Sequence, residues 1–115
     1  MIRVLFVDDD PALLEITKLF LERMGDMAVQ TARSGTEALL QLTKSPYDVI
    51  VSDYDMPEMD GIALLRALRG SGDLTPFIIF TGKHRAHVVI DALNNNADFY
   101  LQKGGDPRTQ FIELT

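Results

Sequence analysis

Short apolar runs alternate with amphipathic stretches along the whole chain, and this alternation is the feature that most constrains its fold. The apolar runs have the length of buried strands, whereas the stretches between them repeat apolar residues at helical spacing. The predicted strands are Ile2–Val7, Met27–Ala32, Asp48–Ser52, Pro76–Phe80 and Phe99–Leu101. Parallel strands need helical crossovers, and those crossovers are right-handed. Five such units in 115 residues predict one α/β domain, a doubly wound parallel sheet with helices on both faces.

Capping residues mark where the predicted helices begin. The predicted N-caps are Asp10, Ser34, Asp60 and Asp106, and one more helix is predicted over Ala86–Leu93. On the first helix we expect a buried face made of Leu13, Ile16, Phe20 and Met24. The last helix has only about two turns before Thr115, and no helix-stop residue follows. We therefore expect residues 1–115 to be a domain cut from a longer protein within its last helix.

Composition and charge exclude several classes of function. The chain has no cysteine, which excludes disulfides, zinc–thiolate sites and thiol nucleophiles. No stretch approaches the roughly 18–20 apolar residues of a membrane span. The net charge of −6 argues against a nucleic-acid surface. We expect a cytoplasmic protein that binds neither nucleic acid nor membranes.

Acidic residues follow two of the predicted strands. Asp8 and Asp9 come directly after the first strand, and Asp53 comes directly after the third. In an open α/β sheet the carboxyl ends of neighbouring strands form the ligand-binding edge. Carboxylates gathered there repel one another unless a cation joins them, and ligands that are all oxygen suit Mg²⁺. The sequence therefore predicts a magnesium site with an aspartate available for phosphoryl chemistry, whereas Asp10 is expected to cap a helix.

Two further strands also end in polar residues. Thr81 follows the fourth strand and Lys103 follows the fifth. Together with the acids, these residues resemble the receiver domain of two-component response regulators, the CheY-like family. The matching residues are Asp8-Asp9, Asp53 with the following MPEMDG, Thr81, Tyr100 and Lys103. The resemblance covers essentially the full chain and implies the flavodoxin-like strand order 2-1-3-4-5. The stretch Lys103–Glu113 resembles receivers joined to archaeal sensory and histidine-kinase modules.

The resemblance implies a chemical role for each acid. Asp53 would accept a phosphoryl group from a phosphohistidine of a sensor histidine kinase, or from a small acyl phosphate, in a reaction that needs Mg²⁺. Asp9 would bind the metal directly, Asp8 would act through a metal-bound water, and Asp55 would offer its backbone carbonyl. Such a domain catalyses only its own phosphorylation and dephosphorylation, so we expect a switch rather than an enzyme.

The resemblance also assigns the residues that read the phosphorylated state. Lys103 and Thr81 would bind phosphoryl oxygens, and Thr81 with Tyr100 would form the conformational switch. Expected partners are the kinase and an output or sensory module, with at most a weak homodimer. Receivers usually have Lys-Pro after the fifth strand, and here the pair is Lys103-Gly104. We expect this bond to be trans, because a cis bond before a residue other than proline costs about 2.5–4 kcal/mol.

Two other functions share some of these residues. Asp53-Tyr54-Asp55 has the D-x-D form of haloacid-dehalogenase-like phosphatases, in which the first aspartate is a nucleophile and the second a general acid. That family usually places the motif after its first strand, whereas here it follows the third. The second alternative is a receiver-like binding module that is never phosphorylated, although such a module has little use for the whole set of acids, Thr81 and Lys103.

Overall fold

The sheet has the expected order. The computed structural model of the protein describes residues 1–81 and 99–102, and it describes side chains for residues 1–80. The strands are β1 (Ile2–Val7), β2 (Met27–Ala32), β3 (Val49–Asp53), β4 (Phe77–Thr81) and β5 (Phe99–Gln102). All neighbouring strands pair in parallel, in the order β2-β1-β3-β4-β5. The predicted bounds of β1 and β2 are confirmed. β3 and β4 each begin and end one residue later than predicted, and β5 ends one residue later.

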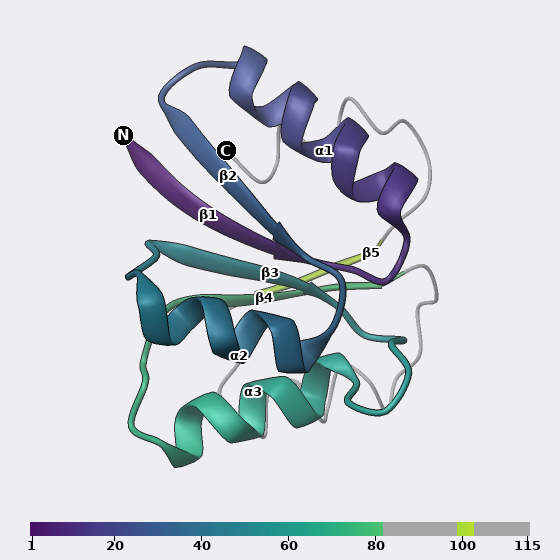
Figure 1. Cartoon of the computed structure of the whole chain (residues 1–115), viewed down its shortest axis with the longest axis vertical. Helices are drawn as coiled ribbons and strands as arrows, with labels where there is room; N and C mark the ends of the chain where they lie inside the picture. The colour runs from purple at the N-terminus through teal and green to yellow at the C-terminus, as the bar shows by residue number, and fades with distance from the viewer. Residues whose placement is uncertain (82–98, 103–115) are drawn as a thin grey trace.

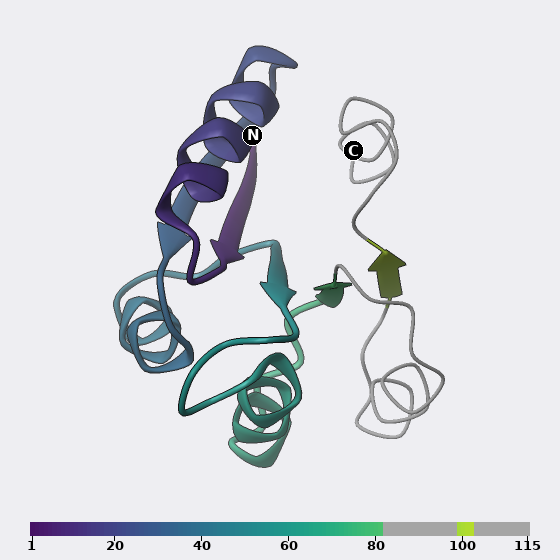
Figure 2. The same cartoon turned by 90° about the vertical axis from the view of Figure 1, so that its right-hand side faces the viewer.

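Three described helices cover the two faces of the sheet. They are α1 (Pro11–Arg23), α2 (Gly35–Lys44) and α3 (Gly61–Gly70). α1 lies on one face, and α2 and α3 lie on the other (Figure 1), a separation that is equally clear in the turned view of Figure 2. No helix among residues 1–81 and 99–102 is long and apolar enough to cross a membrane. The helices predicted over Ala86–Leu93 and after Asp106, with the expected truncation, lie outside the described residues.

Alternation along the strands produces two separate cores. Val4 and Phe6 of β1 point toward α1, whereas Leu5 and Val7 point toward α2 and α3. On the α1 side, Phe6 and Phe80 pack edge to face with ring centroids 6.0 Å apart. Because both faces of the central strands are buried, the strands read in sequence as nearly continuous apolar runs.

The predicted buried face of α1 is partly wrong. The buried side chains are Leu14, Thr17 and Leu21, whereas Ile16 of the predicted face is 60% exposed. α1 carries apolar residues on two adjacent rows at helical spacing, and the spacing alone does not say which row meets the sheet. Packing against the sheet decides it, and the structure selects the row that contains Thr17.

Thr17 is a polar residue in an apolar core, and its removal should stabilise the domain. The side chain is fully buried, and its Oγ1 has no hydrogen-bond partner among the residues that the structure describes. Thr17→Val keeps the shape and removes the hydroxyl, so we expect the free energy of unfolding to rise by about 1 kcal/mol. Urea denaturation measures this. Thr43→Val is the matched control, because the exposed Thr43 hydroxyl already donates to the Leu40 carbonyl oxygen at 2.6 Å; an unchanged or lower stability for Thr17→Val would contradict the expectation.

All three described helices begin at the carboxyl edge of the sheet, and each has the predicted N-cap. The Asp10 carboxylate accepts from the backbone N–H groups of Ala12 and Leu13 at 3.0 and 3.3 Å. Ser34 Oγ accepts from the N–H of Glu37 at 3.1 Å, and Asp60 accepts from that of Ala63 at 2.8 Å. These bonds satisfy N–H groups that a helix start leaves unpaired. They also fix the loops that surround the acidic residues.

Candidate functional site

Three carboxylates meet at the carboxyl edge of the sheet. The register of β1 against β3 pairs Val7 with Ser52. Asp8, directly after β1, and Asp53, the last residue of β3, therefore lie at the same level. One oxygen from each of Asp8, Asp9 and Asp53 can be chosen so that all three lie within 4.8 Å of one another. Asp8 is 1% exposed and Asp53 is 6% exposed, whereas Asp9 faces solvent. The predicted cluster therefore has two buried members and one at its mouth.

The backbone around Asp8 holds its carboxylate in place. The N–H of Asp8 donates to the carbonyl oxygen of Ala32 at 3.0 Å, which continues the ladder between β1 and β2. Its Oδ1 accepts from the N–H of Asp10 at 3.0 Å. The Asp10 carboxylate caps α1, as predicted, and does not belong to the cluster.

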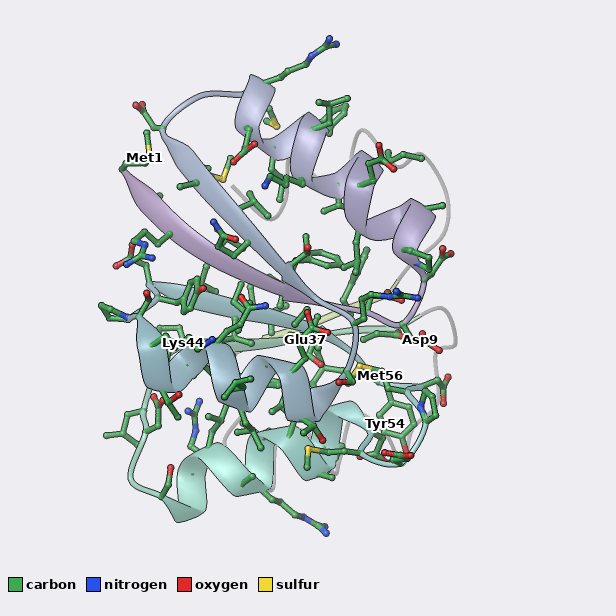
Figure 3. All side chains as sticks on the ribbon, in the orientation of Figure 1. Met1, Asp9, Glu37, Lys44, Tyr54 and Met56 are labelled. Atoms are coloured by element: carbon green, nitrogen blue, oxygen red, sulfur yellow. The ribbon has the colours of Figure 1, made fainter. Side chains whose placement is uncertain are left out.

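The loop after Asp53 is tightly constrained. The N–H of Met59 donates to the carbonyl oxygen of Pro57 at 2.7 Å, and Glu58 between them has φ +68°. This is the geometry of a γ-turn whose central residue is strained. Met56 is buried in the core beneath α2 and α3. Asp9, Met56 and Tyr54 lie at one end of the molecule and Met1 and Lys44 at the other (Figure 3).

Gly61 brings the start of α3 against the phosphoacceptor candidate. Its N–H donates to the carbonyl oxygen of Tyr54 at 2.9 Å. A Cβ at this position would stand 2.5 Å from the carbonyl oxygen of Asp53 and 3.2 Å from the Cα of Tyr54. The sequence placed Gly61 at a helix start and at the end of the MPEMDG stretch, but assigned it no role at the site. The order Asp60-Gly61 is a signal for the turn, but the close approach depends on the tertiary fold.

The remaining predicted site residues are placed only in part. Thr81 is the last residue of β4, and Asp53 pairs with the preceding Phe80, so the ends of β3 and β4 are adjacent. Tyr100 lies in β5 opposite Ile79. The side chains of Thr81 and Tyr100, and the whole of Lys103 with its bond to Gly104, lie outside the described residues. The carboxylate of Asp55 is not among the three clustered side chains, and the role predicted for its backbone carbonyl stays a prediction.

A family model decides between the three functions that share these residues. The model for the response regulator receiver domain matches residues 4–113. The chain is a response regulator receiver domain. Domains of this family are signalling modules that accept a phosphoryl group from a sensor kinase on an aspartate. The haloacid-dehalogenase-like and binding-module alternatives gain no support.

Two regulatory proteins of Mycobacterium tuberculosis support the family assignment. The receiver domain is 37% identical over 102 residues to the transcriptional regulatory protein TrcR of Mycobacterium tuberculosis, covering 89% of this chain and 39% of TrcR. It is 36% identical over 102 residues to the response regulator MprA of the same organism, covering 89% of this chain and 44% of MprA. The chain therefore spans less than half the length of these relatives.

Solved structures match the receiver domain over nearly its whole length. The chemotaxis protein CheY4 of Vibrio cholerae has a TM-score of 0.90 at 31% identity, covering 99% of this chain and 96% of CheY4. The response regulator TrrA of Thermotoga maritima, solved in complex with Mg(2+)-BeF, has a TM-score of 0.85 at 26% identity, with coverage of 99% and 96%.

Magnesium ions should stabilise the receiver domain through the acidic cluster. A ligand that binds only the folded state adds RT ln(1 + [L]/Kd), about 1.4 kcal/mol at ten times its dissociation constant. We expect the thermal midpoint to rise with Mg²⁺, and we expect Asp9→Ala to lose most of that rise, since Asp9 is the exposed member of the cluster. Differential scanning calorimetry measures both, with exposed Glu15→Gln as the control that keeps the wild-type response. A wild-type midpoint that does not respond to Mg²⁺ would count against the site.

Proposed function

We propose that Asp53 is the phosphoryl acceptor of this receiver domain and that the reaction depends on Mg²⁺. The observation that carries the proposal is the meeting of the Asp8, Asp9 and Asp53 carboxylates at the carboxyl edge of the sheet. Asp53 is the member that ends a central strand and is held by the loop that leads into α3.

Phosphoryl transfer to an aspartate requires a carboxylate as the nucleophile and neutralisation of the negative charge on the phosphoryl oxygens. A carboxylate oxygen of Asp53 attacks phosphorus and forms an acyl phosphate, the bond from phosphorus to the donor imidazole nitrogen breaks, and that nitrogen takes up a proton. Bound Mg²⁺ would supply the charge neutralisation that the phosphoryl oxygens require. Asp9 would hold the ion directly, Asp8 through a water, and Asp55 through its backbone carbonyl. The fixed position of Asp8, bonded to the N–H of Asp10, supports a pre-organised site.

Thr81 of β4, Tyr100 of β5 and Lys103, which follows β5, complete the proposal. Lys103 would pair with one phosphoryl oxygen as a point charge, and the Thr81 hydroxyl would donate to another. Thr81 moving toward the phosphoryl group would let Tyr100 change position, so the phosphorylated state would be favoured in a two-state equilibrium. Support comes from the places of these residues along the chain: Thr81 ends β4 beside the Asp53 strand, and Tyr100 lies in the neighbouring strand β5.

The test is phosphorylation by a small acyl phosphate. The domain is incubated with acetyl phosphate with and without Mg²⁺, its intact mass is measured, and the modified residue is mapped. We expect one phosphoryl group on Asp53, formed only with Mg²⁺ and removed by hydroxylamine, which cleaves acyl phosphates. Modification at another residue would contradict the assignment of Asp53. Sustained turnover of a generic phosphate ester would instead favour a phosphatase that uses Asp53 and Asp55.

A sensor histidine kinase is the proposed donor, and the response is proposed to pass to an output or sensory module. The similarity to TrcR and MprA supports an output in the same chain, because those relatives are more than twice as long as the region matched here. The receiver domain itself is proposed not to contact nucleic acid, because its net charge is −6.

A further inference from the structure

Strand β2 forms one edge of the sheet. The N–H of Ile2 donates to the carbonyl oxygen of Asp26, and the N–H of Asp8 donates to that of Ala32, so the even-numbered residues of β2 bond to β1. In a strand, the N–H and C=O of one residue point to the same side and those of the next residue point to the other. The residues whose backbone groups face away from β1 are therefore Met27, Val29 and Thr31. An edge of this kind is a template on which another strand can add.

The usual protections of an edge strand are missing from β2. Its sequence, MAVQTA, contains no charged residue and no proline. Charged side chains and prolines on an edge are the common means by which proteins discourage strand addition. Some other feature must keep this edge closed, or the edge is open to pairing.

Two side chains from helices on opposite faces of the sheet form hydrogen bonds with outward-facing backbone groups of β2. The N–H of Val29 donates to Oε2 of Glu22, a residue of α1, at 3.1 Å. The carbonyl oxygen of Thr31 accepts from Nε2 of Gln41, a residue of α2, at 2.8 Å. The two bonded groups belong to consecutive outward-facing residues. A strand that approached the edge would first have to displace both side chains.

The Gln41 side chain is held at its other end as well. The Tyr47 hydroxyl donates to Oε1 of Gln41 in a long hydrogen bond of 3.4 Å. The guanidinium of Arg3 stands 5.1 Å from the centroid of the Tyr47 ring, within the range of a cation–π interaction. Both ends of the Gln41 amide are thus engaged, which fixes the side chain across the edge.

We propose that Glu22 and Gln41 close the β2 edge against strand addition by a second copy of this chain. A second copy fits the edge because the outward-facing groups are self-complementary. Antiparallel pairing around a two-fold axis at Val29 sets Val29 against Val29 of the second copy, and Met27 against its Thr31. That pairing uses the N–H of Val29 and the C=O of Thr31, the two groups that the side chains hold.

The experiment compares wild-type protein with Glu22→Ala, Gln41→Ala and the double variant. Sedimentation velocity over a range of concentrations reports self-association, and hydrogen exchange followed by NMR reports the Val29 amide. In dilute samples of Glu22→Ala we expect the Val29 amide to exchange roughly tenfold faster, because a charge-assisted hydrogen bond is lost. At high concentration we expect the double variant to dimerise and its Val29 amide to be protected again.

Matched controls separate the edge from general effects of substitution. Glu15→Ala removes an exposed glutamate from the same helix as Glu22, and Gln30→Ala removes an exposed glutamine from β2; both should behave as wild type. Glu22→Gln keeps an acceptor for the Val29 N–H, and it should stay closed. Far-UV circular dichroism and the response to Mg²⁺ check that each variant is folded.

Three results would overturn the proposal. The first is a folded double variant that associates no more than wild type at any concentration. The second is association of the double variant without renewed protection of the Val29 amide, since that would place the contact on another surface. The third is wild-type protein that already pairs through Val29.

Discussion

Asp53→Asn is expected to carry no phosphoryl group under conditions in which the wild-type domain is fully phosphorylated. The amide retains the size of the carboxylate but lacks the charged oxygen that attacks phosphorus, and the other two clustered acids lie in different positions on the β1 side of the site. Intact mass after incubation with acetyl phosphate and Mg²⁺ measures the effect. Asp26→Asn is the control, because Asp26 is exposed and has φ +59°, a conformation that asparagine also accepts.

The same variant should also become more stable without Mg²⁺. Three carboxylates with oxygens within 4.8 Å of one another repel, and neutralising one of them relieves that repulsion in the folded state. We expect the thermal midpoint of Asp53→Asn without metal to lie above that of wild type, and we expect its rise with Mg²⁺ to be smaller. A phosphoryl group on Asp53→Asn would refute the assignment of the acceptor, whereas a lower midpoint would refute the electrostatic account alone.

Gly61→Ala should damage both stability and phosphorylation. The new Cβ would stand 2.5 Å from the carbonyl oxygen of Asp53 and 3.2 Å from the Cα of Tyr54. These are backbone atoms of the segment that carries the acceptor, so the start of α3 or the end of β3 must move. We expect the free energy of unfolding to fall by about 1–3 kcal/mol, the usual effect of overpacking. We also expect phosphorylation to slow by tenfold or more, because displacement of a reacting group by about 1 Å can cost about 10²-fold in rate.

Gly70→Ala is the matched control for that experiment. Gly70 lies at the other end of the same helix, and a Cβ there would meet nothing within 4 Å. Alanine is the better helix former, so we expect Gly70→Ala to be neutral or to stabilise by about 0.5–1 kcal/mol with phosphorylation unchanged. Urea denaturation measures the stability of both variants, and a time course measures their phosphorylation. If the two variants are equally stable and are phosphorylated equally fast, the close approach of Gly61 to Asp53 affects neither property.

The sequence predicted the strands well because their limits are local features, whereas the meeting of the acids also required β1 and β3 to be neighbours. β1 ends where Val7 gives way to Asp8, and an apolar run that stops at an acid is visible without a structure. The strand order came from the family resemblance, because alternation alone is compatible with other orders. The helix starts at Asp10, Ser34 and Asp60 were predicted from short-range capping chemistry, which depends on residues two or three positions apart.

Features that depend on distant segments could not be predicted. The buried row of α1 is chosen by the sheet beneath it, and the sequence favoured the row that contains Ile16 over the row that contains Thr17. The bond from Gln41 to Thr31 joins residues ten apart on different elements. The close approach of Gly61 to Asp53 depends on the shape of the loop between them, which the sequence does not specify. In each case the deciding partner is known only once the chain is folded.

Strand register fixes the position of the acidic site. The domain should therefore tolerate insertions and deletions only where they leave that register unchanged. Val7 pairs with Ala32 on one side and with Ser52 on the other, so the position of Asp8 is fixed from both neighbours. Loss of a single residue within β1 would turn each following side chain to the opposite face and exchange the two cores. An insertion between Ser71 and Pro76, in the connection from α3 to β4, enters no strand and leaves that register intact. Deleting or inserting a single residue should therefore be far more harmful in β1 than in this connection, although the change in chain length is the same.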